Sequence, residues 1–160
     1  MDTKKTTKMH QFVSFLLKKE IFAVDVMKIR GVERMLSITS IPTMPDFLEG
    51  VINLRGTIIP IVDLRKRFKL GSKEPDKETR IILTELETGL VVGMIVDAVK
   101  EVFQVDSAEI GDVPKIGAPN MDQRFIKGVT NKKGTLVILL DAERILTESE
   151  TEGLKSLEQL

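Results

Sequence analysis

A stretch of 22 residues occurs twice in this chain, and this duplication constrains the fold more than any other feature. Residues 47–68 read FLEGVINLRGTIIPIVDLRKRF and residues 125–146 read FIKGVTNKKGTLVILLDAERIL, with seven of the 22 aligned positions identical. In each copy an apolar run meets an Asn and Gly turn and a second apolar run follows. Asn and Gly tolerate positive φ, so each copy is predicted to form a β-hairpin with a turn longer than two residues.

Two further positions in this unit carry a local prediction. Asp63 and its duplicate Asp141 follow the second apolar run, at the place of a helix N-cap, and each is expected to begin one short helical turn. Pro60 lies inside the second apolar run of the first copy. Proline has no N–H for a sheet ladder, so this run is predicted to be an edge strand or to contain a bulge.

The duplication extends to the segments that precede each copy. Residues 12–17 and 21–26 predict one hairpin, and residues 80–86 and 90–96 predict another. Residues 28–35 continue either as a strand or as a short helix. The repeats therefore cover about 11–68 and 80–146, and three apolar residues of the first align with three of the second at an offset of 70: Val26, Ile29 and Val32 with Val96, Val99 and Val102.

The two ends of the chain and the segment between the repeats differ in sequence from the repeats themselves. Residues 1–10, which include His10, are polar and basic and are expected to form a mobile tail. Residues 71–79 form a linker of Gly, Pro and charged residues. Residues 147–160 are expected to form one amphipathic helix, capped near Ser149 and burying Leu154, Leu157 and Leu160. The residues thus predict an all-β fold of two small antiparallel barrels related by an approximate two-fold, with strand exchange between them left open.

Composition argues against several classes of function. The 24 basic and 24 acidic residues cancel, which gives no reason to expect nucleic acid or an anionic membrane as a partner. No apolar run approaches the roughly 20 residues of a membrane-spanning helix, and no secretory signal is expected. With no Cys and one His, neither a metal site nor a cofactor nor catalysis is expected. Four carboxylates are interpreted as turn and surface groups: Asp97, Asp106, Glu109 and Asp112.

Arg55 is the strongest single candidate for recognition. The second copy has Lys132 and Lys133 where the first has Leu54 and Arg55, so the turn itself does not require arginine. One interpretation is that Arg55 pairs with Glu49 or Asp63. This does not exclude the other, in which its planar guanidinium binds the carboxylates or carbonyls of a partner. The duplicated Ile29, Val32, Val99 and Val102 either fill the core or line a groove for a partner helix.

The run EGVINLRGTIIPIVDLRKRF resembles the signature of the CheW family, the chemotaxis coupling proteins of bacteria. The specific part is N-L-R-G-x-x-x-P-x-x-D-L, and residues 11–146 follow the layout of that family throughout. The resemblance implies a CheW-like domain of two five-stranded SH3-like β-barrels related by a pseudo-two-fold, with short helical turns and a C-terminal helix. It also implies no enzymatic activity, and a cytoplasmic protein recruited to receptor arrays at the membrane.

The resemblance implies two partners as well. These are the cytoplasmic tips of methyl-accepting chemotaxis receptors and the regulatory domain of the chemotaxis histidine kinase. Many members of the family carry an acidic residue where this chain has Gly31, and Glu33, two positions later, is the alternative carrier of that charge. Pro114 and Ile116 fall in the region that joins adaptor to kinase, and the expected receptor-binding residues are Arg55, Ile29, Val32, Val99, Val102, Thr79, Arg80 and Ile81.

Two alternatives remain at this point. The first is a scaffold of the same fold in another sensory array, such as one for surface motility, which the sequence does not distinguish from a chemotaxis adaptor. The second is a small-barrel RNA-binding protein. Such a surface needs a basic stripe with stacking aromatic residues, whereas this chain has zero net charge and neither Trp nor Tyr.

Overall fold

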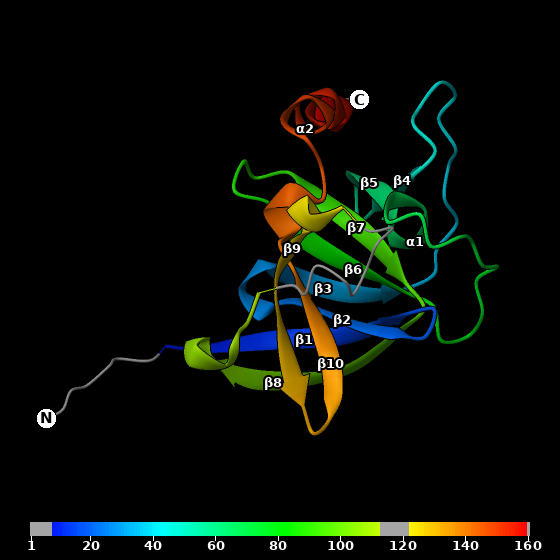
Figure 1. Ribbon diagram of the computed structural model, residues 1–160. Helices are drawn as coiled ribbons and strands as arrows, with labels where there is room; N and C mark the ends of the chain where they lie inside the picture. The colour runs from blue at the N-terminus through cyan, green and yellow to red at the C-terminus, as the bar shows by residue number, and fades with distance from the viewer. Residues whose placement is uncertain (1–7, 113–121, 160) are drawn as a thin grey trace, which may run out of the picture.

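The computed structural model describes residues 8–112 and 122–159, and this part of the chain forms two five-stranded sheets (Figure 1). Each sheet belongs to one of two SH3-like barrels, so the predicted fold class is confirmed. The first sheet has the order β8 (Ala98–Asp106), β1 (Met9–Leu17), β2 (Glu20–Asp25), β10 (Thr135–Leu140) and β9 (Ile126–Lys132). The second has the order β3 (Ile29–Arg34), β6 (Arg80–Glu85), β7 (Val91–Val96), β5 (Thr57–Asp63) and β4 (Leu48–Leu54).

The two repeats exchange strands. The first repeat supplies β1 to β5 and the second supplies β6 to β10, yet β3 pairs with β6 and β8 pairs with β1. Parallel pairing of β10 with β2 and of β5 with β7 completes the exchange. Each sheet therefore combines the opening hairpin of one repeat with the last three strands of the other. This answers the question of strand exchange and makes each barrel depend on the whole chain.

The start of β1 corrects one prediction. Met9 and His10 were expected in the tail, but they pair with Asp106 and Val105 of β8 and belong to the strand. The edge of β8 offers backbone partners that extend the strand toward the N-terminus, a long-range effect that local composition does not reveal. Residues 1–7 of the predicted tail lie outside the described residues.

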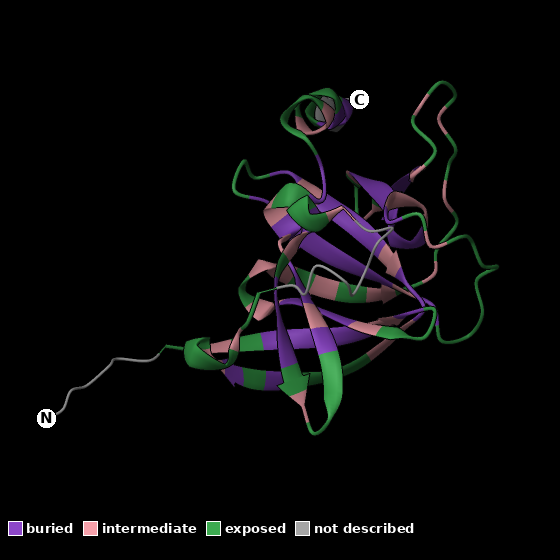
Figure 2. Ribbon diagram, viewed as in Figure 1, coloured by how far each residue is buried: buried purple, intermediate pink, exposed green. Residues whose placement is uncertain are grey.

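Three apolar clusters hold the sheets together. The largest lies between the two sheets and includes Phe15 and Phe22 from the first sheet and Ile82 and Met94 from the second. Smaller clusters fill the individual barrels, one around Phe12 and one around Ile52 and Ile81. Figure 2 shows buried residues along the central strands, and exposed ones at the tip of the β9–β10 hairpin. The shared core offsets the small size of each barrel.

Gly50 and Gly128 are identical in the two repeats because another segment of backbone crosses each of them. Isolated bridges join Thr39 to Val51 and Gly111 to Val129, directly beside the two glycines. A Cβ atom at Gly50 would lie 2.0 Å from the carbonyl oxygen of Thr39, and Gly50 also has a φ of +141°. A Cβ atom at Gly128 would lie 2.6 Å from a side-chain carbon of Ile110. Close approach therefore requires glycine at this position of the repeat.

Replacing Gly50 with Ala should lower the free energy of unfolding by at least about 2 kcal/mol, because backbone strain and steric overlap add. Urea unfolding monitored by circular dichroism would measure it. Gly153 lies inside the C-terminal helix, where an added Cβ would meet no atom within 4 Å, and is the matched control. Gly153→Ala should stabilise by about 0.5–1 kcal/mol, since alanine favours helix. Equal effects of the two changes would contradict this account.

Pro60 lies in β5, a strand with a neighbour on each side. The prediction of an edge strand is wrong, because β5 lies between β7 and β4. The ladder with β7 begins at Ile61, one residue after the proline, so the missing N–H leaves no β7 partner unpaired. The bulge lies in the neighbouring strand, between Leu48 and Gly50 of β4.

The helices are short and follow side-chain caps. Asp63 accepts a hydrogen bond from the backbone N–H of Arg65 (2.9 Å) and begins α1 (Leu64–Arg67), as predicted. Burial raises the pKa of Asp63. Asp141 caps a 3₁₀ turn in the same way. The 3₁₀ turns of the described residues are all three or four residues long and span Val26–Lys28, Ser107–Glu109, Gln123–Phe125, Ala142–Arg144 and Ser156–Gln159.

The C-terminal helix α2 (Glu148–Lys155) begins slightly earlier than the predicted cap near Ser149 implies. Thr147 is the N-cap, and its hydroxyl and the Glu150 carboxylate form a reciprocal capping box. Leu154 and Leu157 are buried against the shared core, as predicted, while Leu160 lies outside the described residues. In the part of the chain that the structure describes, no helix is long and apolar enough to cross a bilayer.

Candidate partner-binding surfaces

The two repeated turns have the same backbone conformation. Asn53 Oδ1 accepts a hydrogen bond from the Gly56 N–H at 2.9 Å, and the corresponding bond from Gly134 to Asn131 is 2.8 Å. Leu54 pairs directly with Thr57, so the loop contains two residues. The predicted longer turn is therefore wrong. Both loop residues have positive φ, which a type I′ hairpin requires and which sequence pattern did not anticipate for an arginine.

Arg55 stands exposed at the tip of the first turn with a φ of 51°. Within the described residues it makes no hydrogen bond or ion pair. The predicted pairing with Glu49 or Asp63 is wrong, because Glu49 pairs with Lys66 at 2.7 Å and Asp63 caps α1. A left-handed conformation costs a residue with a Cβ about 1–2 kcal/mol. An exposed cation in a strained turn that serves no internal contact is available to a partner.

The outer strands β3 and β8 carry the duplicated apolar residues. Val32 pairs with Ile82 as Val102 pairs with Val13, and both strands have a register shift close to these residues. The predicted offset of 70 is therefore a structural equivalence. Val32 is 45% exposed and Val102 56%. Bulges of this kind discourage pairing of an edge with another strand, which leaves the side chains for recognition.

Ile29 and Val99 occupy an intermediate position. Both are half-buried and pack against the shared core between the sheets. The two interpretations of these duplicated residues thus divide by position: Ile29 and Val99 contribute to the core, whereas Val32 and Val102 face outward.

Three other expected receptor contacts lie around the start of β6, and two of them are inaccessible. Ile81 is 0% exposed in the core of its barrel. Thr79 is also buried, and its Oγ1 accepts a hydrogen bond from the Asp76 N–H at 2.9 Å. The predicted roles of these two side chains are corrected accordingly, since β6 is covered on both faces around Ile81, and the turn at Asp76 holds Thr79 inward. Arg80 is partly exposed and donates to the carbonyl oxygens of Lys77 and Thr79. Pro114 and Ile116 lie outside the described residues.

A buried ion pair connects the two halves, and it was not predicted. Arg65 in α1 and Asp97 after β7 are each 8% exposed, and Arg65 Nε donates to both carboxylate oxygens at 2.8 and 2.9 Å. Asp97 also accepts the backbone N–H of Lys18 at 2.7 Å. The carboxylate raises the pKa of Arg65. The assignment of Asp97 to the surface is therefore wrong, because its partners come from segments distant in the sequence.

Arg67 explains why Phe47 and Phe125 are identical in the repeat. Its guanidinium carbon lies 4.2 Å from the ring centroid of Phe47 and 5.1 Å from that of Phe125. The same side chain donates to the carbonyl of Ile145 at 2.7 Å and pairs with Glu150 at 2.8 Å. Cation–π contacts and these polar bonds thus anchor α2 and both repeats to one arginine.

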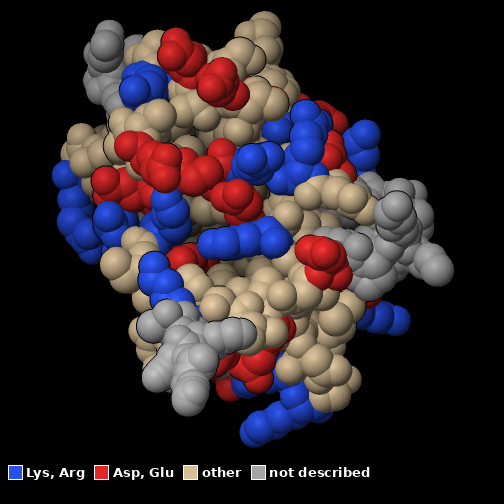
Figure 3. Space-filling view, turned by 60° about the vertical axis from the view of Figure 1, so that its left-hand side comes forward, with Lys and Arg blue, Asp and Glu red and all other residues tan. Residues whose placement is uncertain are grey.

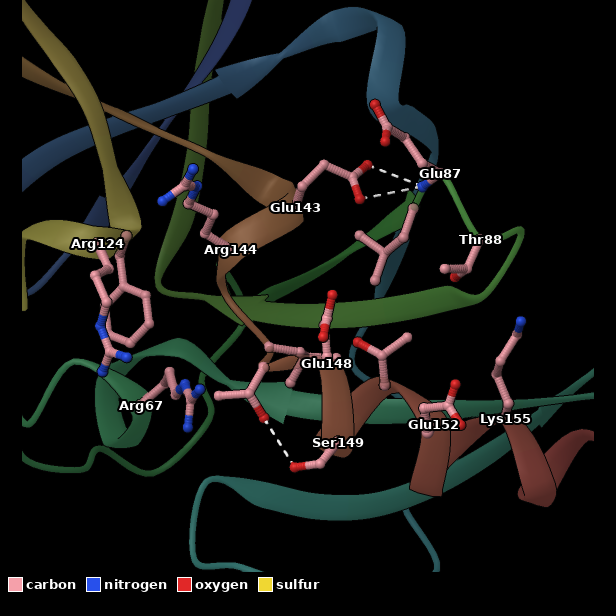
Figure 4. Close-up of a pocket in the computed structure, with 15 residues that line it drawn as sticks. Arg67, Glu87, Thr88, Arg124, Glu143, Arg144, Glu148, Ser149, Glu152 and Lys155 are labelled. Atoms are coloured by element: carbon pink, nitrogen blue, oxygen red, sulfur yellow. Dashed lines mark hydrogen bonds between the residues drawn. The ribbon is translucent and has the colours of Figure 1, made fainter.

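A groove of about 930 Å³ lies between α2, the β6–β7 turn and the 3₁₀ turn at 142–144. Figure 4 shows Arg67, Arg124 and Arg144 at one end and Glu148, Glu152 and Lys155 along the α2 wall. Glu143 already binds the Lys28 ammonium and the Glu87 N–H, so part of its charge is satisfied internally. Figure 3 shows acidic and basic side chains intermingled on the side of the molecule that faces left in Figure 1. In residues 8–112 and 122–159, no group of three or more His, Asp or Glu is placed to hold a metal ion.

Asp122 provides a test of surface electrostatics. Its carboxylate accepts hydrogen bonds from Arg124, which lowers its pKa to about 2. The pair is expected to contribute to stability above the ordinary pKa of an Asp and to lose that contribution as the pH falls through about 2. The contribution is small because the pair is exposed. Carbon-detected NMR titration should show Asp122 protonating with a midpoint near 2, and a midpoint near 4 would contradict the geometry.

Comparison with known proteins decides the family. The family model described as the CheW-like domain matches residues 11–150, most of the chain. The chain belongs to the CheW family. Among curated relatives, the chemotaxis protein CheW of Klebsiella aerogenes is 31% identical over 140 residues, covering 88% of this chain and 83% of that protein. The chemotaxis protein CheW of Thermotoga maritima is 32% identical over 141 residues, covering 86% and 88%.

A solved structure supports the same conclusion at the level of the fold. The scaffolding protein TtCheW from Thermoanaerobacter tengcongensis matches with a TM-score of 0.79 and 34% identity, covering 92% of this chain and 94% of that one. The CheW family consists of chemotaxis scaffold proteins, so the recognition made from the N-L-R-G string is confirmed. The exposed Arg55 lies in the first of the two copies of the turn that is repeated in this chain.

Proposed function

We propose that this chain is a non-enzymatic adaptor that couples methyl-accepting chemotaxis receptors to the regulatory domain of the chemotaxis histidine kinase. Membership of the CheW family supports this, as do relatives named as chemotaxis and scaffolding proteins. The observation that carries the proposal is Arg55, held by a type I′ turn at an exposed tip with no partner among the described residues. The adaptor would act in the cytoplasm, at receptor arrays beneath the membrane.

The receptor-binding surface would begin at Arg55 and continue onto the edge strands. A guanidinium donates several hydrogen bonds at once, which suits carboxylates and carbonyls at the end of a helical hairpin. Val32 and Val102, with the half-buried Ile29 and Val99, supply apolar area whose burial is worth about 25 cal/mol per Å². Arg80 lies at a partly exposed position of β6 and is retained as a receptor contact. Pro114 and Ile116 are retained on the kinase side.

The mechanism follows from having two binding surfaces on one chain. An adaptor that holds receptor and kinase together raises their effective concentration for each other. A receptor can change kinase activity through it only by binding differently in its two signalling states. A coupling free energy of about 1–3 kcal/mol is sufficient.

Co-sedimentation tests the proposal. Membranes that carry receptor tips should pellet this chain, and should pellet the kinase much more strongly when this chain is present than when it is absent. The matched control uses the same membranes with receptors truncated before the cytoplasmic tip. If the chain stays in the supernatant with intact receptors, or pellets equally with truncated ones, receptor coupling is refuted.

A further inference from the structure

An ion pair fixes the crossover between the two sheets. Lys28 ends the 3₁₀ turn Val26–Lys28, which connects β2 of the first sheet to β3 of the second. Its ammonium lies 2.6 Å from a carboxylate oxygen of Glu143, in the 3₁₀ turn Ala142–Arg144. The same carboxylate accepts the backbone N–H of Glu87, in the turn between β6 and β7, at 2.9 Å (Figure 4). One side chain thus joins three segments that are distant in the sequence.

One end of this pair adjoins the proposed receptor surface. Lys28 immediately precedes Ile29, the first residue of β3, and Val32 follows on the same strand. β3 is the outermost strand of its sheet, with β6 as its neighbour. Because such a strand is held by the sheet on one side, the anchor at its start helps to fix where Ile29 and Val32 lie.

The other end adjoins the segment that follows the proposed kinase side. The 3₁₀ turn of Glu143 contacts the turn Gln123–Phe125, whose last carbonyl accepts the Asp141 N–H at 2.9 Å. In the sequence, Gln123–Phe125 is the next turn after Pro114 and Ile116, which are retained on the kinase side. The contact of Lys28 with Glu143 therefore connects the receptor-facing strand to the segment next to the kinase side.

The first repeat has an equivalent of this arrangement with the charges reversed. Arg65 aligns with Glu143 in the duplicated stretch. There Asp97 is the carboxylate that binds both a cation, Arg65, and a hairpin-turn N–H, that of Lys18. The side chains of that pair are 10% and 9% exposed, whereas those of Lys28 and Glu143 are 29% and 26% exposed. Water reaches the second pair, so it can open at little cost, while the buried pair holds the fold.

We propose that the pair of Lys28 and Glu143 transmits the signalling state of the receptor from β3 to the kinase side. The pair is a two-state element: when closed it anchors the start of β3 to the turn of Glu143, and when open it releases both. A receptor whose two states place β3 differently favours one form of the pair, and the kinase side responds to the same change. Lys28 and Glu143 are therefore positioning residues. The inference rests on the proposed function, because it requires both partners.

Removing either charge should uncouple the kinase from the receptor without dissociating it. Kinase autophosphorylation is measured with and without receptor ligand, on receptor-bearing membranes assembled with the kinase and this chain. With the wild-type chain the two rates should differ by at least about five-fold, the lower end of typical coupling. With Lys28→Met or Glu143→Gln the ratio should fall below about two-fold, while the wild-type amounts of kinase and adaptor still pellet. Lys28→Arg keeps the cation and should keep the wild-type ratio.

Arg30→Met is the matched control. Arg30 lies on the same strand and pairs with Glu85 of β6 at 2.6 Å, but this pair stays within one sheet. The receptor should control the kinase normally in this variant, and circular dichroism melts should show that all variants fold. If one of the two test variants does not fold, the other decides.

The inference is overturned if a folded Lys28→Met or Glu143→Gln variant keeps the wild-type ratio, or if Arg30→Met loses it equally. Loss of pelleting in a folded test variant would assign the pair to a binding surface, and loss of folding in both would assign it to the fold. Either result also overturns the inference. A wild-type chain that does not pellet the kinase with receptor-bearing membranes refutes the proposed function itself.

Discussion

Replacing Arg55 with Glu is expected to weaken binding to receptor tips by about 30-fold or more, the effect of losing a central arginine hot spot. The side chain is exposed and has no partner among the described residues, so the change removes no internal contact. The thermal melt should therefore stay within about 3 °C of the wild type, because surface changes usually alter stability by at most about 0.5 kcal/mol. Co-sedimentation with receptor-bearing membranes and circular dichroism would measure the two effects.

Lys133→Glu is the matched control for Arg55→Glu. It reverses a charge at the same position of the same turn, with φ of 50° against 51°, on the other barrel. Receptor binding should persist in this variant. Equal loss in both variants would mean that net charge, and not the first turn, governs binding. A collapse of the melt in Arg55→Glu would assign Arg55 to the fold.

The local parts of the fold were predictable from the sequence because their causes are local. The hairpins follow from apolar runs separated by turn residues, and Asp63 and Asp141 cap helical turns through contacts two residues away. Strand exchange was not predictable in the same way. Both repeats have the same strand pattern, so pairing β3 with β6 satisfies that pattern as well as pairing within one repeat would. Packing across the whole chain selects between them.

The candidate site likewise combines residues that the sequence identified with features that only the structure shows. Arg55 was found because the two copies differ there, but its positive φ and its lack of an internal partner among the described residues required the structure. Thr79 and Ile81 were assigned to the surface by resemblance, whereas the structure buries both, Ile81 in a strand covered on two faces and Thr79 against the turn at Asp76. The pair of Lys28 and Glu143 joins positions 115 residues apart. One sequence signal could have drawn attention to it: aligning the repeats sets Glu143 against Arg65, so the charge at this position is reversed.

The buried pair of Arg65 and Asp97 leads to the largest expected effect on stability. Asp97→Ala would leave the Arg65 guanidinium in a site that is 8% exposed, without its counter-charge, and would also remove the acceptor for the Lys18 N–H. Breaking a buried pair from one side costs about 3–5 kcal/mol. Urea unfolding should show a loss of this size. Because the pair links α1 to the β1–β2 turn, both sheets should lose protection from hydrogen exchange together.

Two further variants separate the pair from a general effect of losing a carboxylate. Asp122→Ala removes the exposed partner of Arg124 and should change the free energy of unfolding by less than about 1 kcal/mol. Arg65→Met combined with Asp97→Leu removes both charges while keeping apolar volume, and should be more stable than Asp97→Ala alone, because no unpaired charge remains buried. If the double variant were less stable than Asp97→Ala, the guanidinium would be stabilising the fold through contacts other than Asp97. If Asp97→Ala and Asp122→Ala cost the same, burial of the first pair would have no energetic consequence.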